Sequence, residues 1–112
     1  MYEKGSEWRK WDLHVHTASS YDASYKGADS DDLLVKAWRS HEFAAVAITD
    51  HFLIDAERIQ RLRDLAPEIT IFPGFEMRTD KGAPNLHVIG IFSEACDLNT
   101  LKNDFFLLVY SS

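Results

Sequence analysis

The stretch FAAVAITDH, residues 43 to 51, decides the fold class, because an apolar run of strand length ends abruptly in polar residues. Such a run is typical of a buried strand. Segments with helical spacing of apolar residues stand on either side of it, at 29–42 and 55–68. Strands that alternate with helices predict an α/β domain with a parallel sheet.

Three further strands are expected, at about 11–16, at 69–76 with a break at Pro73-Gly74, and at 86–92. Ser30 is the expected N-cap of the first helix. The helical residues predicted to face the core are Leu33, Leu34, Ala37, Trp38 and His41 in the first helix and Ile59, Leu62 and Leu65 in the second. His41 is interpreted as a packing or C-terminal cap residue.

The stretch WDLHVHT, residues 11 to 17, carries unusual polarity for a core strand. Strict alternation puts Trp11, Leu13 and Val15 on one face of the strand. Asp12, His14 and His16 then share the other face. A single histidine there is most often a satisfied core residue, but two histidines with an acid beside them favour a metal site.

Further metal-ligand residue types stand near the ends of the expected strands. In parallel α/β folds, sites gather at the carboxyl ends of the strands, so we expect one rim to collect these side chains. They are His14, His16, Asp22, Asp50, His51, Glu76 and His87. Structural alternatives remain open for three of them, since Asp50 is also compatible with a helix cap, Glu76 with a surface acid and His87 with a solvated strand face.

Length, charge and cysteine content set limits on the function. A chain of 112 residues is one domain or part of one. The net charge of −6 argues against nucleic-acid binding by bulk electrostatics, which usually needs a basic face. Cys96 is the only cysteine, and its expected role is structural. We therefore expect a cytoplasmic protein, with no signal peptide, no membrane span and no membrane partner.

The motifs DLHVHTASSYD, ITDH, GFE and NLHVIG together resemble the first motifs of the PHP (polymerase and histidinol phosphatase) superfamily. The match runs from about residue 11 to residue 92. The resemblance implies the N-terminal part, about four β/α units, of a distorted seven-stranded β/α barrel. It also implies up to three bound divalent ions (Zn, Mn or Fe) and a phosphoesterase activity.

By the same resemblance, His14 and His16 bind one ion, Glu76 bridges, and His87 belongs to the set of the third ion. Asp22 and His51 would help to hold the other ion, and Asp50 would orient a ligand from behind. The implied substrate is a phosphate ester, with nucleic acids and nucleotides among the candidates. The opening GSEWRKWDLHVHT is also similar to PHP segments joined to an SMC-like or AAA-like ATPase, so an ATPase domain is a candidate partner.

The sequence departs from the family pattern in one respect. PHP proteins supply a further histidine and a late Asp-x-His pair, which residues 1–112 do not contain. We therefore expect residues 1–112 to be an incomplete PHP domain, weak or inactive alone, whose partner is the remainder of the barrel. The expected origin is the N-terminal piece of a longer protein, and a premature stop or frameshift near residue 104 is the alternative.

Two alternative functions stay open: a non-catalytic metal-stabilised module that serves an attached polymerase or ATPase, and a hydrolase acting on C–N or C–O bonds.

Overall fold

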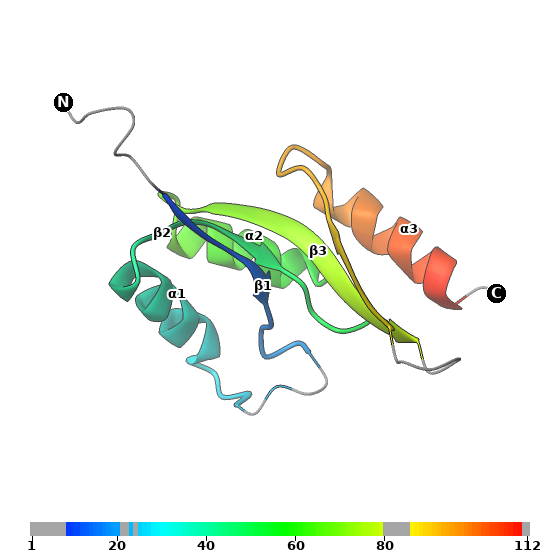
Figure 1. Cartoon of the computed structure of the whole chain (residues 1–112), viewed down its shortest axis with the longest axis horizontal. Helices are drawn as coiled ribbons and strands as arrows, with labels where there is room; N and C mark the ends of the chain where they lie inside the picture. Colours follow the sequence, from blue (N-terminus) through cyan, green and yellow to red (C-terminus); the bar gives the residue numbers. More distant parts are fainter. Residues whose placement is uncertain (1–8, 21–22, 24, 80–85, 111–112) are drawn as a thin grey trace.

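The computed structural model describes residues 9–20, 23, 25–79 and 86–110. The elements in chain order are β1 (Lys10–Val15), α1 (Ser30–Ser40), β2 (Phe43–Ile48), α2 (Ala56–Leu65), β3 (Thr70–Thr79), β4 (Leu86–Ile91) and α3 (Leu98–Tyr110). The strands form one curled half-barrel sheet in the order β1-β2-β3-β4 (Figure 1). This confirms the α/β class. No helix in these ranges is both long and apolar enough to cross a bilayer.

The strand directions correct the expectation of a parallel sheet. β1 pairs with β2 and β2 with β3 in parallel, but β4 runs antiparallel to β3. Only residues 80–85 separate β3 from β4, whereas a parallel crossover needs about a dozen residues or more. The start of β4 therefore lies beside the end of β3.

β3 is continuous through Pro73-Gly74, so the predicted break in this strand is wrong. Its first part, up to Pro73, pairs with β2, and its second part, from Gly74, pairs with β4. The two residues thus mark a change of partner. Glycine is needed here because an added Cβ would lie 2.5 Å from the carbonyl oxygen of Gly90. This switch lets β3 extend to the candidate site.

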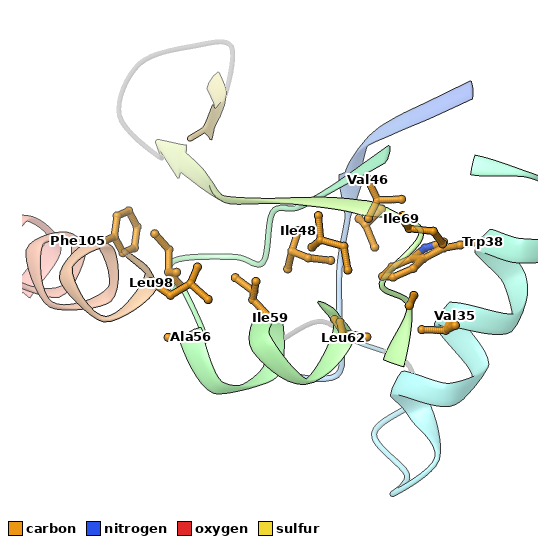
Figure 2. Packing of buried hydrophobic residues seen from close by; sticks show 14 residues of the cluster. Val35, Trp38, Val46, Ile48, Ala56, Ile59, Leu62, Ile69, Leu98 and Phe105 are labelled. Atoms are coloured by element: carbon orange, nitrogen blue, oxygen red, sulfur yellow. The ribbon is translucent and has the colours of Figure 1, made fainter. Parts of the chain in front are cut away.

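The hydrophobic core lies between the sheet and the three helices, with α2 in the middle (Figure 2). Ile59 and Leu62 of α2 are fully buried against sheet residues. α1 contributes Trp38 from one side, and α3 contributes Phe105 from the other (Figure 2). The ring of Phe105 lies 4.7 Å from that of Phe75. Most of the buried apolar side chains therefore lie on the face of the sheet that the helices cover.

The buried helix faces differ in part from the predicted ones. In α1 the row Asp31, Val35 and Trp38 is buried, whereas Leu33 and Ala37 are exposed. In α2, Leu65 is also exposed. The buried face of α1 is the one that faces α2, because Arg58 and Arg61 of α2 bind the carboxylate of Asp31 in the first turn of α1.

Of the two caps predicted for α1, the structure confirms the C-cap and corrects the N-cap. Asp29, not Ser30, occupies the N-cap position of α1, and His41 is the C-cap residue as expected. At the start of α2, the side chain of Asp55 accepts a hydrogen bond from the backbone N–H of Arg58 (3.0 Å). This is the arrangement that aspartate favours at an N-cap.

Asp31 joins α1 to α2 through a buried carboxylate. Its Oδ1 lies 2.6 Å from Nη1 of Arg58, and its Oδ2 lies 2.9 Å from Nη1 of Arg61. The Asp31 side chain is only 7% exposed, so both contacts form largely out of water. A charged hydrogen bond of this kind is worth more than a neutral surface one.

We expect Asp31→Ala to lower the free energy of unfolding by about 2 kcal/mol, because two guanidinium groups lose their shared acceptor. Urea unfolding followed by circular dichroism measures the change. Asp32→Ala is the matched control, since Asp32 lies in the same first turn but is exposed. An equal loss of unfolding free energy in both variants would mean that negative charge in the first turn of α1 stabilises the fold, and not the contacts of Asp31 with the two arginines.

β1 departs from strict alternation. Between Asp12 and Val15 it advances three residues while its partner β2 advances two, from Val46 to Ile48. This irregularity is a β-bulge, and it turns Val15 onto the core face. The prediction of one apolar face is therefore wrong for Trp11 and Leu13, which are 57% and 41% exposed.

Trp11 instead lies on the side of the sheet away from the helices. It pairs with Ala45, and its ring centroid is 5.9 Å from that of Phe72.

Candidate metal centre

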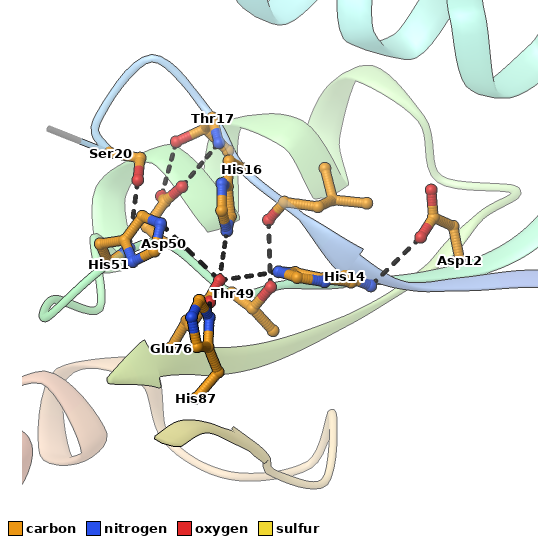
Figure 3. A network of polar contacts seen from close by, with 11 residues as sticks. Asp12, His14, His16, Thr17, Ser20, Thr49, Asp50, His51, Glu76 and His87 are labelled. Carbon is orange, nitrogen blue, oxygen red and sulfur yellow. Dashed lines mark hydrogen bonds and ion pairs between the residues drawn. The ribbon is translucent and has the colours of Figure 1, made fainter. Parts of the chain in front are cut away.

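The centre of the site is Glu76, a buried carboxylate in β3. Its side chain is only 2% exposed. Four histidines surround it, from three other parts of the sheet (Figure 3). His14 belongs to β1 and His16 follows it, His51 follows β2, and His87 belongs to β4. The alternative of a surface acid for Glu76 is therefore wrong.

The contacts are short and involve both carboxylate oxygens. Oε1 of Glu76 lies 2.7 Å from Nε2 of His14 and 2.8 Å from Nε2 of His16. Nε2 of His51 lies 3.7 Å from the same oxygen. Oε2 lies 2.9 Å from Nδ1 of His87. One carboxylate therefore gathers four imidazoles.

His14 and His16 point to the same place despite the bulge. One ligand atom from each of these histidines and from Glu76 lie within 4.8 Å of one another, close enough to hold a metal ion. The ring of His16 lies 4.9 Å from that of His14 and 4.5 Å from that of His51. His14 and His87 are each 50% exposed, so the cluster is open to solvent on one side.

Glu76 is ionised throughout the physiological pH range. Burial raises its pKa, but contacts with His14, His87 and His16 and the charge of His51 outweigh that effect and lower the pKa to about 2. A buried anion is costly unless it is paired. Contacts with the four histidines offset the cost of burying the Glu76 carboxylate.

This shift predicts a pH dependence of stability for the metal-free protein. The pKa of Glu76 falls on folding from 4.5 to about 2, so its stabilising contribution is complete above pH 4.5. The contribution is lost as the pH falls toward 2. Thermal unfolding between these limits, with a chelator present, should show a steeper loss in the wild type than in Glu76→Gln. An equal loss of thermal stability with falling pH in the two proteins would contradict the low pKa of Glu76.

A layer of hydrogen bonds behind the cluster fixes the loops that carry the histidines. Asp50 is 1% exposed, and its two oxygens accept bonds of 2.6 Å from the backbone N–H and the hydroxyl of Thr17. The backbone N–H of His51 donates to the hydroxyl oxygen of Ser20 (3.1 Å). Because Thr17 follows His16, these bonds join the loops after β1 and β2.

Burial raises the pKa of Asp50, and the bonds from Thr17 and the charge of His16 partly offset the rise. Asp50 therefore holds a loop and is not a helix cap. The predicted role of Asp50, to orient a metal ligand, would be exerted on His16 by holding the backbone of Thr17, the next residue.

The backbone at His51 is tied directly to β3. The N–H of Glu76 donates to the carbonyl of Asp50 (3.0 Å), and the N–H of Phe52 donates to the carbonyl of Glu76 (2.9 Å). Phe52 adopts a φ of 60°, in the left-handed region that bulky residues avoid. Such strain costs about 1–3 kcal/mol and tends to occur at functional sites.

The structure brings together five of the six predicted ligands: His14, His16, His51, Glu76 and His87. Asp22 lies outside the described residues. Metal binding by these side chains stays a prediction. Sequence reasoning missed Thr17, Ser20 and Phe52, because hydroxyl bonds and backbone strain leave no periodic signal in a sequence.

In comparisons with known proteins, no family model matches the chain, and no curated protein matches it. The comparisons therefore identify no family, and the case for a functional site stands on the geometry around Glu76.

Proposed function

We propose that the four histidines and Glu76 bind a divalent transition metal and that the bound form belongs to a phosphoesterase. The supporting observation is the convergence of four imidazoles from three strands on one buried carboxylate. Imidazole and carboxylate ligands together suit Zn²⁺, Mn²⁺ or Fe²⁺. A hydrogen-bonded core histidine explains one such contact, but not four on the same group.

The choice of reaction rests on the motifs. DLHVHTASSYD, ITDH, GFE and NLHVIG resemble the PHP superfamily, and the proposal includes a PHP-type barrel of which this half-barrel is the first part. Bound divalent ions would polarise a phosphoryl oxygen and lower the pKa of water.

The protein's own residues have separate tasks. Glu76 supplies the buried negative charge and fixes the histidine rings. His14 and His87 are half exposed, and they line the side from which a substrate phosphate approaches. Asp50 and Thr17 hold the loop after His16 in place.

The test combines metal content with hydrolysis. Purified protein is loaded with Zn²⁺ or Mn²⁺, analysed for bound metal, and assayed with p-nitrophenyl phosphate and bis(p-nitrophenyl) phosphate. We expect at least about one ion per chain and slow, metal-dependent hydrolysis, since the sequence contains only the early part of the ligand set that the resemblance implies. Binding should weaken below about pH 6, as imidazoles protonate.

His14→Ala should lose both metal and hydrolysis while keeping its fold, because His14 is half exposed. His41→Ala is the control, since His41 caps α1 and lies outside the cluster. Protein without metal after reconstitution would overturn the proposal. Full metal loading without hydrolysis of either ester would leave only the non-catalytic metal module.

A further inference from the structure

A cavity lies directly beside the histidine cluster. Its volume is about 450 Å³, within the range of small-molecule sites. His16 forms part of its wall, and the same ring lies 2.8 Å from Oε1 of Glu76. The cavity and the candidate metal centre therefore share the side chain of His16.

Most of the wall away from His16 is apolar, and Thr17 and Ser30 add two hydroxyl groups to it. It includes Ala18 from the loop after β1, and Leu33, Leu34 and Ala37 from α1. The ring of Tyr25 adds an aromatic surface, and its hydroxyl donates to Asp29. The described residues that line the cavity include no Asp, Glu, Lys or Arg. The chemistry thus changes from charged at the cluster to uncharged and mainly apolar in the described wall of the cavity.

We propose that this cavity binds the organic group of the substrate, and that this group is an uncharged aromatic ring attached to the phosphate. The inference rests on the proposed function, because the cluster must hold the phosphate end. A phosphate at the cluster directs its ester substituent past His16 into the cavity. Burial of a ring against apolar walls is favourable because it removes apolar surface from water, and an aromatic side chain adds a favourable ring contact.

The position of α1 supports this assignment. Leu33 is 48% exposed, although the helix buries Val35 and Trp38 on its core face. A leucine that is half exposed at a cavity wall contributes little to stability. It is well placed to contact an apolar ligand.

The test uses phosphonates, whose C–P bond is not hydrolysed, and the Zn²⁺-loaded full chain. Dissociation constants of phenylphosphonate and methylphosphonate are measured by titration calorimetry. We expect phenylphosphonate to bind about tenfold more tightly or better, because its ring is removed from water. Leu33→Glu should reduce this preference to about threefold or less.

Leu65→Glu is the matched control: a leucine of similar exposure, on α2 and outside this cavity, whose replacement should leave the preference intact. Circular dichroism confirms that both variants are folded. If both phosphonates bind equally, the inference fails while the proposed function stands. The same holds if Leu33→Glu keeps the full preference. If neither phosphonate binds the Zn²⁺-loaded protein, the proposed function fails, and the inference fails with it.

Discussion

Glu76→Gln is expected to weaken Zn²⁺ or Mn²⁺ binding by more than about 100-fold. Loss of a group that only orients ligands costs about 10–100-fold, and Glu76 is itself the group on which the four histidines converge. An amide keeps the size of the side chain but loses the charge and one acceptor oxygen. Competition with a chelating dye measures the affinity.

Glu68→Gln is the control for this result. Glu68 is exposed and pairs with Arg39 on the surface at 2.7 Å, so its replacement removes the same charge away from the cluster. We expect its metal affinity to stay within about twofold of the wild type, because surface charges are screened. Equal weakening in both variants would show that net charge alone attracts the metal. Unchanged affinity in Glu76→Gln would place the ion elsewhere.

Leu62→Ala is expected to lower the free energy of unfolding by about 3–5 kcal/mol. Leu62 is fully buried at the centre of the core, where α2 faces the sheet (Figure 2). Truncation there removes buried apolar surface and leaves a cavity. Urea unfolding gives the value, and Leu65→Ala on the exposed side of the same helix should cost less than about 1 kcal/mol.

The variant Leu13→Ala tests whether Leu13 is exposed, as in the structure, or buried, as strict alternation predicts. Alternation along β1 predicts a buried Leu13 and a loss like that of Leu62, whereas the bulge leaves Leu13 41% exposed. We therefore expect a loss of less than about 1 kcal/mol. A loss as large as that of Leu62→Ala would mean that this face of the sheet is covered in solution.

The amino-acid sequence by itself located most of the local elements, but not α3. Helical spacing of apolar residues located α1 and α2, and apolar runs located the four strands, because these periodicities depend only on near neighbours. Residue chemistry also singled out His14, His16, His51, Glu76 and His87, since imidazoles and carboxylates near strand ends stand out against an apolar background.

Only the tertiary structure decided how these elements meet. The direction of β4, the bulge in β1 and the burial of Glu76 all depend on pairing between strands, which local periodicity does not encode. The bulge inserts one residue, so Val15 after it faces the core whereas Trp11 before it does not. Glu76 became the centre of the site because β3 at this point is bonded on one edge to the segment that follows β2 and on the other edge to β4, which brings histidines from both neighbours to one carboxylate.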